Sequence, residues 1–262
     1  MTKLLEGKTA IIYGGGGGIG GGVAETFARE GARVFLAGRT KEPLEKVAKR
    51  INAAEGSAKV SVLDALDEAA VEAHAQEVAA TTGSLDVSFN LISRGDVQGT
   101  PLVEMTTDDL LRAVDSGLRS NFITARAAAR RMIEQRSGVI LHLNSASGAG
   151  AMPGMGSTGP ADAATEAFMR YLAAEVGPQG VRVCGIWTAG VAETLTDEKI
   201  AEVGGEGAAT AQTVKEMIGA MAALRHAPRL AEVAEVAAFL ASDRASGITG
   251  TMANVTSGLV LR

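Results

Sequence analysis

The stretch YGGGGGIGGG, residues 13–22, decides the fold. It joins a short apolar run, residues 9–14, to an amphipathic pattern over residues 19–31 that ends at a glycine. A glycine-rich turn between a buried strand and a helix lets the backbone approach a pyrophosphate, and the helix N-terminus offers free N–H groups. This context favours a dinucleotide-binding turn over a flexible linker. Gly21 and Gly22 fall inside the predicted helix, where each costs about 1 kcal/mol relative to Ala. Close packing and a mobile turn are both open explanations for them.

The rest of the chain alternates in the same way between short apolar runs and longer helical patterns. The predicted strands cover residues 9–14, 32–38, 58–65, 85–92, 138–145, 181–187 and 252–258. The predicted helices cover residues 19–31, 42–56, 67–82, 107–136, 160–177 and 231–242. Apolar strands that alternate with helices indicate crossover units and a parallel sheet covered on both faces. We therefore expect one α/β domain over residues 1–262, with a Rossmann-type doubly wound parallel sheet. The less regular segment 191–227, with a helical pattern near 209–224, suggests a lid.

Composition excludes several classes of protein. The chain has 46% hydrophobic and 21% charged residues, as expected for a soluble globular protein. It has no apolar run of about 18 residues that would cross a bilayer, and its N-terminus lacks the pattern of a secretory signal. Cys184 is the only cysteine, which excludes an internal disulfide and agrees with a reducing compartment. The net charge of −5 argues against nucleic-acid binding. We expect a cytoplasmic protein that binds a small molecule and neither nucleic acid nor membrane.

Several motifs together resemble the short-chain dehydrogenase/reductase family. The family spacing T-G-x-x-x-G-I-G is matched by Tyr13, Gly14, Gly18, Ile19 and Gly20. Further family motifs are similar to VLDALD (62–67), GVILHLNSASGAGAMPG (138–154), GVRVCGIWTAGVAET (180–194) and ITGTMANVTSG (248–258). The resemblance covers essentially the whole chain and implies an oxidoreductase that uses a nicotinamide cofactor. It also implies a set of cofactor-binding residues, which are Gly14, Gly18, Ile19, Gly20, Asp64, Asn90 and Thr194.

The end of the second predicted strand bears on the choice between NAD and NADP. An acid there would bond the ribose hydroxyls of NAD and repel a 2′-phosphate, whereas this chain has Gly38 followed by Arg39. A guanidinium can hold a phosphate with two N–H groups at once. The alternative is an exposed arginine that follows a strand. The residues favour NADP over NAD, with Arg39 on the 2′-phosphate.

The departures from the family cluster on the residues that carry the chemistry. In the family a tyrosine exchanges the substrate proton, and a lysine four residues later lowers the pKa of that tyrosine. A serine polarises the substrate oxygen, and an asparagine supports a water chain. Counted from Ser145 at the serine position, the tyrosine and lysine positions fall on Thr158 and Asp162. The asparagine position falls on Gly117, with Asn121 one helical turn later as a substitute candidate. Only Ser145 remains.

Thr158 and Asp162 cannot repeat the chemistry of the residues that they replace. An alcohol is a far weaker acid than a phenol, whose pKa is about 10. An aspartate in place of a lysine reverses a charge, and one charge pair near 5 Å is worth about 3 kcal/mol at an effective dielectric constant of about 20. A protonated Asp162, with its pKa raised by burial, could act as a general acid. The sequence favours the other interpretation, a carboxylate that caps the helix at 160–177.

Two further breaks lie beside the expected cofactor. The family's N-N-A-G reads here as residues 90–93, Asn-Leu-Ile-Ser, and the threonine before its first glycine is Tyr13. These joint changes indicate one repacked region, in which Tyr13 fills space rather than serving as a relocated proton donor. The family's P-G pair is replaced by Thr188 and Ala189. The cofactor pocket as a whole is therefore expected to be rebuilt.

Three hypotheses about function follow. The first is an NADP(H)-dependent oxidoreductase that reduces a small-molecule carbonyl by a non-standard, substrate-assisted mechanism with Ser145. The second is a catalytically inactive member that binds a nucleotide or ligand as a sensor or partner subunit, and the third is a lyase or isomerase without redox chemistry. The three histidines are scattered, so no metal site is predicted. The helices at 107–136 and 160–177 match those that pair across a two-fold axis in the family. We expect a homo-oligomer, a tetramer rather than a dimer.

Overall fold

The computed structural model describes residues 3–205 and 207–261. In these residues the chain forms a seven-stranded parallel sheet in the order β3-β2-β1-β4-β5-β6-β7. The strands are β1 (Thr9–Tyr13), β2 (Arg33–Gly38), β3 (Ser57–Val62), β4 (Val87–Asn90), β5 (Gly138–Ser145), β6 (Val181–Thr188) and β7 (Thr251–Val255). The strand order changes direction between β1 and β4, which opens a crevice at their carboxyl ends. The predicted doubly wound Rossmann-type sheet is confirmed.

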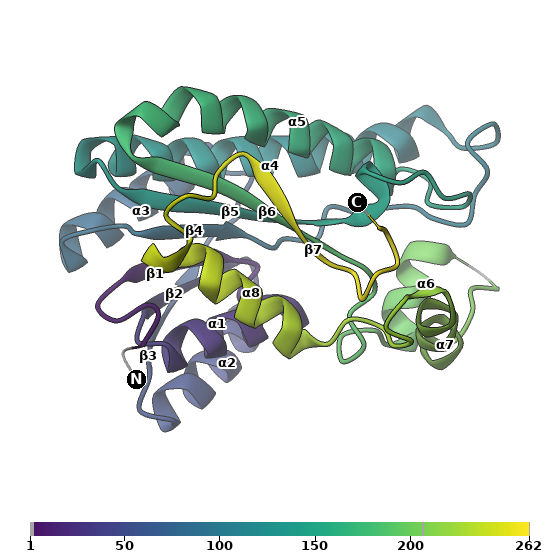
Figure 1. Ribbon diagram of the computed structural model, residues 1–262, viewed down its shortest axis with the longest axis horizontal. Helices are drawn as coiled ribbons and strands as arrows, with labels where there is room; N and C mark the ends of the chain where they lie inside the picture. Colours follow the sequence, from purple (N-terminus) through teal and green to yellow (C-terminus); the bar gives the residue numbers. More distant parts are fainter. Residues whose placement is uncertain (1–2, 206, 262) are drawn as a thin grey trace.

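Helices cover both faces of the sheet (Figure 1). One face carries α1 (Gly18–Arg29), α2 (Lys41–Ala53) and α8 (Leu230–Ala241), and the other carries α3 (Glu68–Thr82), α4 (Thr107–Gln135) and α5 (Thr158–Val176). Side chains of β1 alternate between the two cores, with Ile12 on the α1 side and Ile11 on the α4 side. Because parallel strands are buried on both faces, they read as continuous apolar runs, which is why the sequence identified them.

Close packing explains the two glycines inside α1. A Cβ on Gly22 would lie 2.5 Å from Leu230 Cδ2 of α8. A Cβ on Gly21 would lie 3.1 Å from Val47 Cγ2 of α2. The glycines therefore let α1 approach both neighbouring helices, which decides between the two explanations left open by the sequence.

The segment 191–227 contains two helices at one end of the molecule (Figure 1). The helix predicted near 209–224 is α7 (Ala211–Met221), whereas α6 (Asp197–Gly204) was not predicted. The backbone N–H of Gln98 donates to the carbonyl oxygen of Val203 at 2.9 Å, which joins α6 to the loop after β4. Within residues 3–205 and 207–261, no helix combines the length and the hydrophobicity needed to cross a membrane.

Candidate active site

The crevice at the carboxyl ends of the central strands holds a cavity of about 580 Å³. It lies where the strand order changes direction, the usual ligand position in a doubly wound sheet. Its lining comes from the glycine turn, from the loops after β2, β3 and β4, from α4 and from α6. These residues include Gly14, Gly16–Gly20, Gly38–Thr40, Leu63–Leu66, Leu91–Ser93, Ser116 and Lys199.

The glycine turn packs closely against itself and against the loop after β4, and it leaves the N-terminus of α1 uncapped. Gly14 has a φ of +79°, and a Cβ on it would lie 2.5 Å from the carbonyl oxygen of Leu91. A Cβ on Gly20 would lie 2.2 Å from the carbonyl oxygen of Gly14. No side chain caps α1 at Gly17, and the first turn of α1 carries no acidic residue. The first N–H groups of α1 and the positive end of its dipole are therefore available to a phosphate, and the residues fit a dinucleotide.

Most of the predicted cofactor residues lie around this cavity. Its lining contains Gly14, Gly18, Ile19, Gly20, Arg39 and Asp64. Thr194 packs against the turn from outside, because a Cβ on Gly18 would lie 2.8 Å from its methyl carbon. Asn90 is buried and faces α4, where its Nδ2 donates to the hydroxyls of Ser120 and Thr124 at 3.3 Å each. Asn90 therefore ties β4 to α4 rather than lining the cavity.

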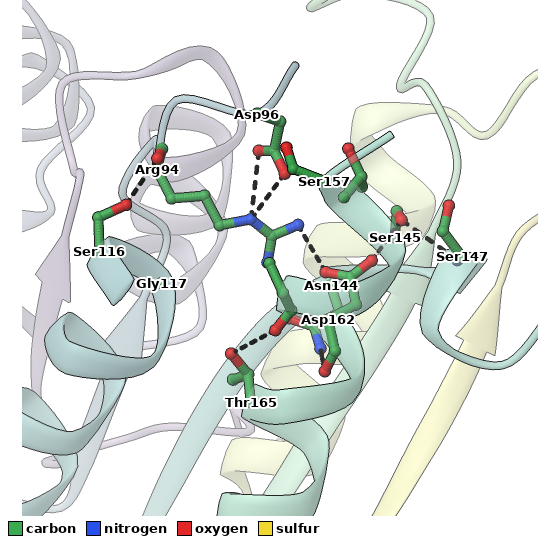
Figure 2. Close-up of polar contacts among 12 residues, drawn as sticks. Arg94, Asp96, Ser116, Gly117, Asn144, Ser145, Ser147, Ser157, Asp162 and Thr165 are labelled. Carbon is green, nitrogen blue, oxygen red and sulfur yellow. Dashed lines mark hydrogen bonds and ion pairs between the residues drawn. The ribbon is translucent and has the colours of Figure 1, made fainter. Parts of the chain in front are cut away.

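A second group of polar side chains surrounds Ser145 at the end of β5 (Figure 2). The hydroxyl of Ser145 donates to Asp162 Oδ2 at 2.5 Å. Asp162 Oδ1 lies 2.6 Å from Nη2 of Arg94, and Arg94 Nε donates to both carboxylate oxygens of Asp96 at 3.0 and 3.2 Å. We call these four residues the Asp162 cluster. The N-cap of α5 is Ser157, and Asp162 lies one turn inside the helix, so the capping role favoured by the sequence was wrong.

Gly117 makes room for Arg94. A Cβ at residue 117 would lie 2.9 Å from Arg94 Cδ. The hydroxyl of Ser116 donates to the carbonyl oxygen of Arg94 at 2.6 Å and fixes the loop against α4. A larger side chain at position 117 would press on the aliphatic part of Arg94, whose guanidinium pairs with Asp162. The small residue at position 117 and the acid at position 162 therefore belong to one arrangement, since Arg94 packs beside the first and pairs with the second.

Burial sets the electrostatics of the Asp162 cluster. Burial raises the pKa of Asp162 to about 6, although the charge of Arg94 and the hydrogen bond from Ser145 act to lower it. Burial also acts to lower the pKa of Arg94, but the carboxylates of Asp162 and Asp96 outweigh it and raise that pKa above its usual range. The guanidinium therefore stays charged, whereas burial holds the pKa of Asp162 well above its usual value.

The other candidate residues have structural contacts. Thr158 is buried, and its hydroxyl accepts a hydrogen bond from Gln98 Nε2 at 3.0 Å. Asn121 donates from Nδ2 to the carbonyl oxygen of Gly117 at 2.9 Å, within its own helix. Tyr13 is 1% exposed in the core under α3 and α4, and burial raises its pKa above the usual value for a phenol. Its space-filling role is confirmed.

Comparison with known proteins agrees with this geometry. A family model described as enoyl-(acyl carrier protein) reductase matches residues 15–260. The chain belongs to the short-chain dehydrogenase/reductase family. Similar proteins include 3-oxoacyl-[acyl-carrier-protein] reductase FabG of Chlamydia muridarum, 30% identical over 269 residues that cover 99% of this chain and 100% of that protein. Tropinone reductase-like 2 of Erythroxylum coca is 33% identical over 263 residues, covering 98% of this chain and 91% of that protein.

Solved structures of short-chain dehydrogenases/reductases superpose over almost the whole chain. A crystal structure of NAD⁺-bound xylitol dehydrogenase has a TM-score of 0.86 at 25% identity and covers 97% of this chain and 99% of its own. A 7α-hydroxysteroid dehydrogenase complexed with NADH and 7-oxo glycochenodeoxycholic acid has a TM-score of 0.83 at 27% identity, covering 98% and 96%. The family is one of oxidoreductases whose cofactor is NAD or NADP, as the motifs implied.

Sequence reasoning missed three functional candidates in this short-chain dehydrogenase/reductase. Arg94 and Asp96 come directly after residues 90–93, where the sequence differs from the motif expected of the family. Two charged residues at that place were the signal that could have pointed to them. Lys199 of α6 reaches the lining of the dinucleotide cavity. Its signal was weak, because it lies in the irregular segment that was assigned to a lid.

Proposed function

We propose that the protein is an NADP(H)-dependent oxidoreductase that reduces the carbonyl group of a small molecule without a tyrosine proton donor. The observation that carries this proposal is Ser145, which is half-buried at the end of β5 and hydrogen-bonded to a buried carboxyl group. Leu143, two residues before it, and Ser93, next to Arg94, both line the dinucleotide cavity. The site thus combines a cofactor cavity with the Ser145 hydroxyl, which is hydrogen-bonded to the carboxyl group of Asp162.

Different residues around the cavity would bind different parts of the cofactor. The glycine turn and the N-terminus of α1 would hold the pyrophosphate, and Asp64 would lie by the adenine. Arg39, exposed at the end of β2, would hold a 2′-phosphate with two N–H groups, and Gly38 presents no acid to repel it. Lys199 adds a positive charge from α6, which would act as a lid together with α7. When bound, the cofactor supplies the hydride.

The loops next to Thr158 favour an apolar substrate. The loop after β4 and the loop before α5 are joined by backbone hydrogen bonds, from Gly99 to Gly154 at 2.8 Å and from Ser157 to Val97 at 3.1 Å. They expose large apolar side chains, which include Leu102, Val103 and Met152. Quinone-like carbonyls with a neighbouring phenol belong to the candidate substrates, since a phenol would add its own proton.

Calorimetric titration of NADPH and NADH tests the cofactor. We expect NADPH to bind at least tenfold more tightly, and Arg39→Ala to remove that preference, because the 2′-phosphate then has no guanidinium partner. An equal affinity of the unmodified protein for the two nucleotides would contradict the NADP assignment. Binding of neither would contradict a functional dinucleotide site.

Oxidation of NADPH against a panel of ketones, aldehydes and quinones tests the reaction. We expect turnover of an apolar or quinone-like carbonyl, and a loss of about 10²-fold or more in Ser145→Ala, because the substrate oxygen loses its hydrogen-bond donor. Tight NADPH binding with no turnover across the panel would instead favour a nucleotide-binding sensor or partner subunit.

A further inference from the structure

Asp162 and Ser145 differ in their access to solvent. Asp162 has no exposed surface, whereas Ser145 at the end of β5 is only half-buried. Their side-chain oxygens lie 2.5 Å apart. The carboxyl group is thus closed to a substrate, whereas Ser145 borders solvent. A proton can therefore pass between Asp162 and a substrate only through a neighbouring group, and Ser145 is a hydroxyl in direct contact with the carboxyl group.

The hydrogen-bond capacity of Ser145 couples the two groups. A serine hydroxyl has one donor and two acceptor positions. Ser145 Oγ already accepts a hydrogen bond from the backbone N–H of Ser147 at 3.2 Å. When Asp162 is ionised, the single O–H of Ser145 is donated to the carboxylate, and a substrate oxygen finds no donor there. When Asp162 is protonated, it donates to Ser145, both acceptor positions are filled, and the O–H of Ser145 is free for a third partner.

We propose that Asp162 is the general acid–base group of this enzyme and that Ser145 relays its proton, an inference that rests on the proposed carbonyl reduction. In the reduction, the carbonyl carbon gains a hydride, the carbonyl oxygen takes the proton of Ser145, and Ser145 takes the proton of Asp162. The C=O double bond becomes CH–OH, and Asp162 is left as a carboxylate. After the alcohol leaves, Asp162 regains a proton from water through Ser145. Oxidation of the alcohol runs the same steps in reverse and begins with ionised Asp162.

Arg94 is a positioning residue in this relay. A carboxyl group as deeply buried as that of Asp162 would stay protonated without a cation, and Arg94 at 2.6 Å lets it ionise. Asp96 holds the guanidinium from its other side (Figure 2). The balance leaves the pKa of Asp162 at about 6, in the range that suits a general acid–base group.

The remaining groups packed against Asp162 do not compete for its carboxyl oxygens. Asn144 of β5 donates to the main-chain oxygen of Asp162 at 3.1 Å. Glu166, one turn further along α5, accepts from Trp187 Nε1 at 2.7 Å and lies 4.0 Å from Arg170. The charged groups that set the titration of Asp162 are therefore Arg94 and Asp96.

The first test needs no cofactor and no substrate. The carboxyl group is followed by ¹³C NMR of aspartate-labelled protein through a pH titration. We expect one aspartate to titrate near pH 6, to be absent in Asp162→Asn and to move to higher pH in Ser145→Ala, because the carboxylate then loses a hydrogen bond. In Asp96→Asn it should move to lower pH, since the nearby negative charge is gone. No aspartate titrating between about pH 5 and 7, or no response to Ser145→Ala, would overturn the coupling.

The second test uses the pH dependence of turnover. With a carbonyl substrate we expect kcat/KM to be constant below about pH 6 and to fall tenfold per pH unit above it, and alcohol oxidation to show the mirror image. Asp162→Asn should lower kcat by about 10²-fold or more and remove this dependence, because its amide cannot give up a proton. Its NADPH affinity should stay within threefold. Asp243→Asn, which removes an exposed carboxylate paired with Lys8, is the matched control.

The outcomes separate the relay from the proposed function. Carbonyl reduction by Asp162→Asn at the unmodified rate, with the same pH dependence, would overturn the relay and leave the carbonyl reductase standing. An unmodified protein that binds NADPH and reduces no carbonyl would overturn the proposed function and with it the relay. If Asp162→Asn does not fold, Ser145→Ala and Ser145→Thr replace it. The threonine hydroxyl should restore most of the turnover and of the pH dependence, and failure of that rescue would contradict the relay.

Discussion

At the scale of single residues, the site is built around Asp162, which pairs with Arg94 and accepts a hydrogen bond from Ser145. Asp162 of α5 stands where the family resemblance led us to expect a lysine, and the cation beside it is Arg94 on the loop after β4. Gly117 belongs to the same arrangement, because a Cβ there would lie 2.9 Å from Arg94 Cδ. Residues that act as a unit are strongly non-additive, so restoring some of them need not restore the activity of the set.

The double variant Thr158→Tyr with Asp162→Lys should therefore fail as a conventional dehydrogenase. The new lysine would lie beside Arg94, and two like charges about 4 Å apart repel by about 4 kcal/mol at an effective dielectric constant of about 20. We expect a lower melting temperature than that of Thr158→Tyr alone, and no gain in NADPH turnover on simple ketones and aldehydes. Robust turnover by the double variant would show that the frame lacks only two side chains.

Two buried groups, Asp162 and His142, should change the free energy of unfolding in opposite directions as the pH rises. Burial raises the pKa of Asp162 from 3.8 to about 6, so the folded protein holds this proton more tightly than the unfolded chain does. The free energy of unfolding from this group falls as the pH rises through that window. His142 of β5 is 2% exposed, and burial lowers its pKa from 6.5 to about 4. The folded protein excludes that proton, so the contribution of His142 rises with pH over nearly the same window.

A variant that lacks one of the two groups should show the pH dependence of stability that the other group contributes. Between about pH 4 and 6.5, we expect the melting temperature of Asp162→Asn to rise with pH more steeply than that of the unmodified protein. His142→Leu should rise less steeply or fall. A shift of about two pKa units corresponds to about 3 kcal/mol across the window, which thermal melts resolve. Parallel pH dependences in the three proteins would show that neither group changes its protonation on unfolding.

At the scale of helices and strands, the sequence predicted what local patterns determine. The predicted strand 138–145 matches β5, because an apolar run in a parallel sheet is buried on both faces. The helix α6 was missed because none of its described residues is buried, so it has no apolar periodicity. Its signal was the cap, in which Thr196 accepts a hydrogen bond from the backbone of Lys199 and acidic residues follow. The Arg94–Asp162 contact could not be predicted from local patterns, since it joins a loop and a helix that are distant in the sequence.

The packing of α1 against α8 predicts that Gly22→Ala destabilises the protein, although alanine favours a helix more than glycine does. Gly22→Ala should gain about 1 kcal/mol of intrinsic helix stability, yet the new Cβ would lie 2.5 Å from Leu230 Cδ2. Overpacking of this kind costs about 1–3 kcal/mol, so we expect Gly22→Ala to lower the melting temperature. Adding Leu230→Ala should relieve the clash, and the double variant should be more stable than Leu230→Ala alone. A melting temperature of Gly22→Ala above that of the unmodified protein would show that α1 and α8 can separate without cost.

At the scale of the whole molecule, α4 and α5 form a mostly apolar groove on the outside of the sheet. Its lining residues are Leu111, Val114, Asp115, Leu118, Arg119, Phe122, Ala164 and Phe168. Phe122 of α4 is 42% exposed and Leu111 is 52% exposed. Phe122 meets Phe168 of α5 edge to face, with ring centroids 5.7 Å apart. Ala161 of α5, by contrast, is buried in the core. The exposed apolar surface therefore involves α4 as much as α5, and both helices are the ones expected to pair across a two-fold axis.

The assembly can be tested on this groove. We expect a closed dimer or tetramer at micromolar concentration in sedimentation velocity, since a self-complementary apolar surface is buried by a second copy of the chain. Phe122→Arg should lower the oligomeric state, because the interface would then have to bury two guanidinium groups without partners. Leu224→Arg, which changes a 66% exposed leucine outside the groove, should leave the assembly unchanged. Because α5 also carries Asp162, a dissociated Phe122→Arg variant that keeps full turnover would show that the Asp162 cluster is held by the subunit alone. An unmodified protein that sediments as a monomer would rule out the groove as a subunit interface.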